Sequence, residues 1–248
     1  MTTTLEHLPV ERGMRMRGLS MTRLETFADA AFAFAVTLLV ISVDDLPETF
    51  EELEIAIKSI PVFLFSAAQV FALWIAHRNW SRVYGLDNGV AVLLTLLLVV
   101  GLLVMVFPLR IVYAFGVADL SDDWIPPPFV LDPVTWAEQL TLVFVTYGIS
   151  WAWLAGVVVA MFAYVLVRSR GLELNAAERR NAVVFLAMYG VIALSGVSSV
   201  TLALTLPHDL LHLAGYQYFL LLPLPVIALA LRARERNRLR DATVPAGQ

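Results

Sequence analysis

The chain contains no cysteine, so it can form no disulfide, thiolate metal site or thiol nucleophile. Charged residues are also scarce, at 15% of the composition, whereas hydrophobic residues make up 59% and the mean hydropathy is +0.77. These values lie outside the usual range of soluble domains and are typical of membrane proteins. Residues 1–20 are polar with mixed charge and lack the apolar core of a signal peptide, so no cleaved leader is expected.

Six segments are long and apolar enough to cross a bilayer as helices, because a hydrocarbon core of about 30 Å requires roughly 20 apolar residues. We place these spans at residues 22–43, 57–79, 88–113, 138–167, 181–205 and 210–231. The sequence therefore predicts an all-α polytopic membrane protein with six transmembrane helices. Its parts are an N-terminal segment (1–21), the six-helix domain (22–231) and a basic tail (232–248).

The arginines predict the direction in which the helices cross the membrane, because short loops rich in basic residues stay in the cytoplasm. Of the 17 basic residues, all but Lys58 and Arg110 lie before the first span, after the second, after the fourth or after the sixth, or within two residues of those ends, as Arg23 and Arg78 do. The intervening loops are acidic, and one of them, DDWIPPPFVLDP, is too rich in proline to be helical. We therefore expect a cell-membrane protein with both termini in the cytoplasm, whose basic tail is an interfacial anchor and not a nucleic-acid-binding patch.

An ionisable residue, Asp29, lies within the first apolar segment. It is about 10 Å along the helix from its start, where a carboxylate surrounded by hydrocarbon needs a partner. On the second span, Trp74 and His77 are three residues apart and share a helix face on the same side of the membrane. We predict a polar cluster of these three residues with Arg23. In the alternative interpretation, Asp29 caps a helix that starts late and His77 lies at the membrane interface.

These polar positions resemble the signature of a known family. The stretch RLETFAD at residues 23–29 resembles the Arg-x-x-x-Phe-Ser-Asp motif in the first helix of the transmembrane protein 175 family of potassium channels, except that Ala28 replaces the serine. Ser66 and the stretch WIAH at residues 74–77 resemble the second helix of that family, and Phe-Pro at residues 107–108 resembles the end of its third. Beyond this point the resemblance is limited to the six-helix pattern.

The resemblance implies a homotetramer in lipid, with a central pore for potassium ions lined by four copies of the first helix and with no cofactor, metal site or catalytic residue. The helical spacing of Ala30, Phe34, Thr37 and Ile41 is compatible with this, because these residues form one stripe. Asp29 lies about 110° around the helix from the stripe, among Ala33, Val36 and Val40, and would face the second helix. We therefore interpret Asp29 as a structural tie and not as an ion ligand.

Selectivity would have an unusual origin in such a channel. The chain has no carbonyl filter of the Thr-Val-Gly-Tyr-Gly kind. The resemblance implies instead an apolar constriction on the first helix, where a cation sheds part of its hydration, which costs less for potassium than for sodium. Phe34 occupies the position where the family usually has isoleucine or leucine.

Three other interpretations stay open at this stage. The stripe also suits a helix packed inside a monomer. A secondary transporter, proton- or ion-coupled, would have broken helices at matching positions in two halves, and Pro223 and Pro225 interrupt only the sixth span. An intramembrane metalloenzyme is suggested by His208 and His212, which have the spacing of His-Glu-x-x-His zinc sites with Asp209 in place of glutamate, but no third ligand is evident.

Overall fold

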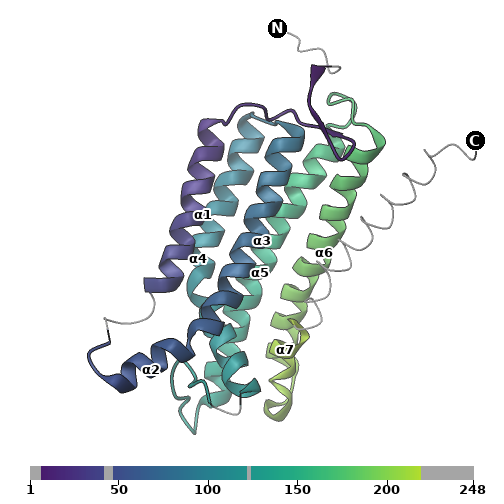
Figure 1. Ribbon diagram of the computed structural model, residues 1–248. Coiled ribbons are helices and arrows are strands. Elements are labelled where there is room, and N and C mark those ends of the chain that lie inside the picture. The colour runs from purple at the N-terminus through teal and green to yellow at the C-terminus, as the bar shows by residue number, and fades with distance from the viewer. Residues whose placement is uncertain (1–6, 42–46, 122–123, 219–248) are drawn as a thin grey trace, which may run out of the picture.

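The computed structural model describes residues 7–41, 47–121 and 124–218, without the side chain of Ile41 (Figure 1). Its long helices are α1 (Arg23–Ile41), α3 (Ile60–Tyr84), α4 (Gly89–Leu120), α5 (Trp136–Val167) and α6 (Ala176–Thr205). The shorter elements are the hairpin strands β1 (Val10–Glu11) and β2 (Met14–Arg15), helix α2 (Phe50–Lys58), the 3-10 turn η2 (His208–Leu210) and helix α7 (Leu213–Tyr216).

The long helices lie where the first five spans are predicted. Among the described residues, four helical stretches are long and apolar enough to cross a membrane: Phe50–Tyr84, Gly89–Leu120, Trp136–Val167 and Ala176–Thr205. The first predicted span corresponds to α1, which has 19 residues. The described start of the predicted sixth span, residues 210–218, contains the end of the 3-10 turn η2 and helix α7. Its remainder, residues 219–231 with both prolines, and the basic tail lie outside the described residues.

Helix α2 corrects the prediction of an acidic loop after the first span. It starts with a capping box, in which the Thr49 hydroxyl accepts a hydrogen bond from the Glu52 amide at 3.2 Å and the Glu52 carboxylate accepts one from the Thr49 amide at 3.4 Å. Glu54 and Lys58 form an ion pair of 2.8 Å one turn apart. The Thr-x-x-Glu signal for this helix start is present in the sequence. The high acid content of the segment obscures it.

The two ends of the bundle differ in charge. Helices α1 and α6 begin, and α3 and α5 end, at what we call the arginine-rich end (Figure 1), which holds Arg15, Arg17, Arg23, Arg78, Arg82, Arg168 and Arg179. Helices α2 and α7 and the proline-rich segment 124–135 lie at the opposite, acidic end. The basic clusters from separate loops thus meet at one end, as the positive-inside pattern predicts.

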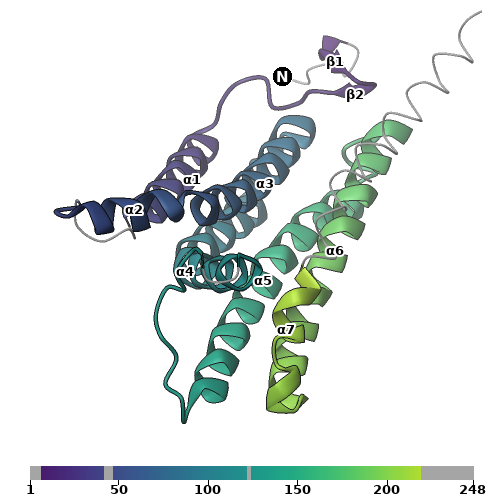
Figure 2. The same cartoon turned by 60° about the horizontal axis from the view of Figure 1, so that its bottom comes forward.

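Helix α1 lies at one edge of the bundle and α6 at the other, with α3, α4 and α5 between them (Figure 2). The closest packing joins α5 to α6 and α4 to α5, while α1 packs against α3 and α4. The main hydrophobic core runs through these contacts and includes Leu73, Leu102, Leu154 and Phe162, each at most 1% exposed. Within the described part of the chain, one face of α1 is therefore left uncovered.

Candidate pore helix and its polar contacts

Helix α1 has a buried and an exposed face. Ala28, Phe32, Ala35 and Leu39 are at most 4% exposed and face α3 and α4. The exposed residues of α1 are Arg23, Thr26, Phe27, Ala30, Ala33, Phe34, Thr37 and Val40. Three members of the predicted stripe, Ala30, Phe34 and Thr37, are thus on one exposed surface, and the side chain of the fourth, Ile41, lies outside the described residues.

The exposed face is wider than the predicted stripe. The sequence places Ala33 and Val40 on the packing side with Asp29, whereas the structure exposes both. The reason is that, among the described residues, the main packing partners of α1 are α3 and α4, which leave the side with Ala33 and Val40 uncovered. Asp29 and Val36 are partly buried at the boundary between the two faces.

Thr37 is the polar residue of the predicted stripe. Its hydroxyl donates a hydrogen bond to the Ala33 carbonyl, at 3.0 Å, within the same helix. This bond satisfies the donor and leaves the lone pairs of the oxygen free to accept. The residue can therefore present an oxygen ligand from an otherwise apolar surface.

Asp29 and Trp74 tie α1 to α3. The Trp74 indole nitrogen donates to the Asp29 carboxylate at 2.8 Å, a length typical of a hydrogen bond to a charged acceptor. The guanidinium of Arg78 lies over the Trp74 ring, 5.6 Å from its centroid. The carboxylate is thus directed at the neighbouring helix and away from the exposed stripe.

The other two residues of the predicted cluster make no hydrogen bond to Asp29 or Trp74 among the described residues. His77 is only 2% exposed, but its Nε2 is 3.3 Å from the Thr95 hydroxyl of α4, and its ring contacts Phe32 and Trp80. Arg23 is exposed and makes no hydrogen bond or ion pair with any described residue. Pairing of Asp29 with Trp74 is therefore present without the expected four-residue cluster. Thr95 could not have been selected from the sequence, since only the packing of α3 on α4 brings it to His77.

A second set of polar contacts at the start of α1 was missed by sequence reasoning. Thr22 and Glu25 form a capping box, with the Thr22 amide 2.8 Å from the Glu25 carboxylate and the Glu25 amide 3.2 Å from the Thr22 hydroxyl. The Ser81 hydroxyl of α3 donates to the other oxygen of that carboxylate. These residues border a cavity of about 170 Å³ that is also lined by His77 and Asp87. The Thr-x-x-Glu spacing indicates the cap in the sequence, whereas the contact to Ser81 depends on the packing of α1 against α3.

A third group of polar side chains lies inside the bundle. The Tyr113 hydroxyl donates to the Gln69 side-chain oxygen at 2.6 Å, and the Gln69 side-chain nitrogen donates to the Tyr147 hydroxyl at 3.2 Å. Gln69 and Tyr147 are 9% and 2% exposed. This group connects α3, α4 and α5 and gives each buried polar atom a partner, as helix association in lipid favours.

The two histidines considered for zinc are held apart from each other. His208 lies in the 3-10 turn η2 and its ring contacts Trp136, whereas His212 contacts Tyr216. The pair therefore does not lie on successive turns of one α-helix, which the His-x-x-x-His geometry requires. Within the described residues, no group of three or more His, Asp or Glu side chains is arranged to hold a metal ion.

The comparison with known proteins matches the segment that contains α1, α3 and most of α4. Residues 23–108 match the family described as "Endosomal/lysosomal potassium channel TMEM175". This part of the chain is similar to the TMEM175 family. The resemblance seen in the motifs at residues 23–29 and 74–77 is thereby confirmed, and the relationship is to channels and not to enzymes.

Two relatives of the chain extend this finding. A potassium channel of Marivirga tractuosa is 41% identical over 99 residues, which are 40% of this chain and 40% of that relative. The matching region thus spans less than half the length of the curated relative. A crystal structure of a variant of the potassium channel MtTMEM175, in complex with a nanobody–MBP fusion protein, superposes with a TM-score of 0.73 at 26% identity and covers 92% of this chain and 100% of that one. The chain therefore has the fold of a TMEM175 channel.

Proposed function

We propose that four copies of the chain assemble in the cell membrane around a pore lined by α1, and that the assembly conducts potassium in preference to sodium. One observation carries the proposal: α1 lies at the edge of the subunit with Ala30, Phe34 and Thr37 on a continuous exposed face, opposite a buried one. The TMEM175 match of residues 23–108, which includes all of α1, supports it.

The composition of the exposed face suits contact between helices. Ala30 and Ala33 are small, and small residues allow membrane helices to approach closely where hydrophobicity gives no drive for association. Thr37 adds a polar oxygen that lipid chains would not solvate. A shared axis surrounded by four such faces would accommodate both features.

Phe34 would form the constriction. Four phenyl rings around one axis make a narrow apolar passage that water leaves readily, so a cation entering it loses hydration. Thr37, about 4.5 Å further along the helix, would supply oxygen to the partly dehydrated ion. The tie between Asp29 and Trp74 supports this arrangement because it sets the rotation of α1 about its own axis.

The arginine-rich end would face the cytoplasm, with both termini, and the acidic end would face outward. Glu51, Glu52 and Glu54 of α2 are exposed at that outer end, where their charge would raise the local concentration of cations.

The test is the current carried by the purified protein in a planar bilayer under opposed potassium and sodium gradients. We expect discrete unitary currents that reverse near the potassium equilibrium potential, and a tetrameric mass by native mass spectrometry. A saturable flux coupled to a second gradient would identify a secondary transporter instead. A monomeric mass with retained current would rule out the shared pore.

A further inference from the structure

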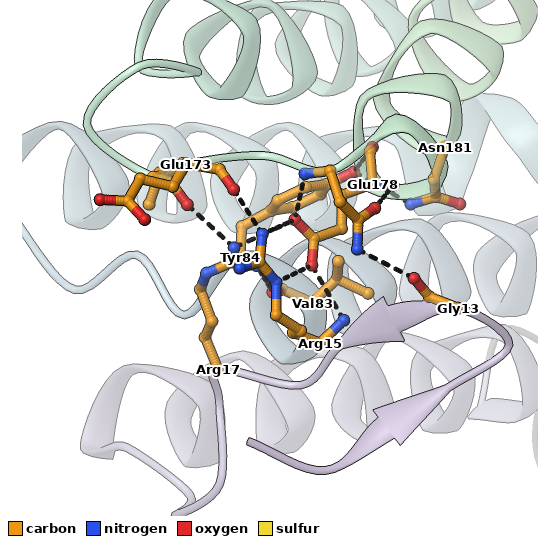
Figure 3. A network of polar contacts seen from close by, with 10 residues as sticks. Gly13, Arg15, Arg17, Val83, Tyr84, Glu173, Glu178 and Asn181 are labelled. Carbon is orange, nitrogen blue, oxygen red and sulfur yellow. Dashed lines mark hydrogen bonds and ion pairs between the residues drawn. The ribbon is translucent and has the colours of Figure 1, made fainter. Parts of the chain in front are cut away.

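The N-terminal hairpin is bound to the start of α6 through Glu178 (Figure 3). The Glu178 side chain is 0% exposed and accepts hydrogen bonds from the backbone amide and the guanidinium of Arg15, at 2.9 and 2.9 Å, and from the guanidinium of Arg17 at 3.0 Å. It also accepts one from the backbone amide of Asn175, the N-cap of α6, at 3.0 Å. A buried carboxylate is tolerated only when it is fully paired in this way. We call Arg15, Arg17 and Glu178 the N-terminal clasp.

Arg17 joins three separate parts of the chain. Besides Glu178, its guanidinium donates to the Val83 carbonyl at the end of α3, at 3.1 Å, and to the Leu172 carbonyl in the loop between α5 and α6, at 2.9 Å. A planar guanidinium can hold several acceptors at once in fixed directions, which an ammonium group does less well. The same guanidinium is therefore a junction between the N-terminal segment, α3 and α6.

The segment that follows Arg17 is fitted closely against the end of α3. The Gly18 amide donates to the Arg82 carbonyl at 3.0 Å, and a Cβ atom at Gly18 would lie 2.9 Å from the Ser81 carbonyl oxygen. Gly85, which ends α3 with a φ of 57°, would likewise place a Cβ 2.8 Å from the Cβ of Arg17. Both glycines are thus required by the close approach of the two backbones.

The contacts continue from this segment into α1. Thr22 caps the helix through Glu25, and the Glu25 carboxylate accepts the Ser81 hydroxyl of α3. One turn further, Asp29 accepts the Trp74 indole. A chain of polar contacts therefore leads from Glu178 on one edge of the bundle to the beginning of α1 on the other (Figure 2). Helix α6 itself packs on α5 and α7, whereas α1 packs on α3 and α4.

We propose that the N-terminal clasp is a positioning device for the pore helix: the pairing of Arg17 with Glu178 holds residues 15–22 against α3 and so sets the position of the arginine-rich end of α1. This inference rests on the proposed role of α1 in lining the pore. Phe34 lies about 16 Å along the helix from Arg23. Loss of the clasp should therefore change the open probability of the pore. The preference for potassium over sodium should stay unchanged, because it depends on the constriction at Phe34.

The first test does not depend on conduction. We would measure hydrogen–deuterium exchange of the full-length protein with Arg17→Gln or Glu178→Gln, and use Arg12→Gln, at the exposed tip of the same hairpin, as the matched control. Loss of a buried ion pair should accelerate exchange of residues 19–27 at least about tenfold in both variants. Acceleration confined to residues 172–182, with residues 19–27 at the rate of the control, would overturn the proposal.

A conservative variant covers the case in which Arg17→Gln does not fold. Arg17→Lys retains the charge but cannot hold Glu178, Val83 and Leu172 in the same planar geometry. We expect it to assemble and to accelerate exchange of residues 19–27 by an intermediate factor. Exchange identical to that of wild type would show that a positive charge at position 17 is enough to hold residues 19–27. The planar geometry of the Arg17 guanidinium would then not be needed.

The second test uses bilayer currents of the same variants. We expect the open probability to change by about tenfold or more in Glu178→Gln, with the unitary conductance and the reversal potential unchanged. Wild-type open probability in assembled Glu178→Gln would overturn the positioning role. Absence of current from the wild-type protein would instead refute the proposed channel function, and the exchange experiment would still decide the structural part of the inference.

Discussion

Two phenylalanines on α1 provide a matched pair for testing the exposed stripe. Phe32 is 4% exposed and belongs to the main hydrophobic core, whereas Phe34, two residues away, is 53% exposed. Truncation of a buried phenylalanine to alanine costs about 3–5 kcal/mol in free energy of unfolding. Because Phe34 has only about half of that burial within the subunit, the same truncation should cost roughly 1.5–2.5 kcal/mol there. The two variants should therefore differ by about 2 kcal/mol in subunit stability.

The two variants should also differ in flux. We expect Phe34→Ala to assemble and to carry a larger potassium current with weaker discrimination against sodium, because loss of four phenyl rings widens the apolar passage and lets ions keep more water. Phe32→Ala should instead lose assembly without a gain in current. The measurements are size-exclusion chromatography, thermal unfolding followed by fluorescence, and current in bilayers under opposed potassium and sodium gradients.

Either of two results would refute this reasoning. Unchanged current and unchanged selectivity in well-assembled Phe34→Ala protein would remove Phe34 from the pore, and the stripe assignment with it. Equal destabilisation by Phe34→Ala and Phe32→Ala would place both rings in packing contacts, and the exposed face of α1 would then be an interface between subunits without a central path.

Three further outcomes are expected. Thr37→Val should assemble normally but lower the potassium current, since it removes the one hydroxyl of the stripe; equal currents would exclude an ion ligand at this position. Trp74→Phe should lower the thermal stability more than Asp29→Asn. Loss of the indole donor to a charged acceptor costs about 1.5–3 kcal/mol, whereas an asparagine at position 29 still accepts a hydrogen bond from the indole. If unfolding assays gave the reverse order, the charge of Asp29 would have a partner other than Trp74. In intact cells, a membrane-impermeant thiol reagent should label the variant Thr49→Cys and should not label Ser169→Cys. Labelling of Ser169→Cys without labelling of Thr49→Cys would show that the chain crosses the membrane in the opposite direction.

The class of protein and most of its helices could be predicted from the amino-acid sequence. Apolar length and the scarcity of charge predict the spans that α1, α3, α4, α5 and α6 occupy, because the thickness of the hydrocarbon core constrains composition over about 20 residues at a time. The motif at residues 23–29 indicated the resemblance to the family whose model matches residues 23–108, and the 3.6-residue period put Ala30, Phe34 and Thr37 on one face. Helix α2 was not predicted, because its acidic residues suggested a solvated loop, although Thr49 and Glu52 form the Thr-x-x-Glu pattern of a helix start.

The pairing of the polar groups, in contrast, depends on how the helices pack against one another. Trp74 reaches Asp29, but His77, three residues later on the same helix, turns to Thr95 because α4 packs beside α3 at that point. The arginines that indicate topology in the sequence also differ in whether they have a partner. Arg17 is bound to Glu178, more than 150 residues later in the chain, while Arg23 is exposed. Hydrogen bonds between residues so far apart depend on backbone positions that no local pattern encodes, whereas burial against lipid depends on composition that every segment carries by itself.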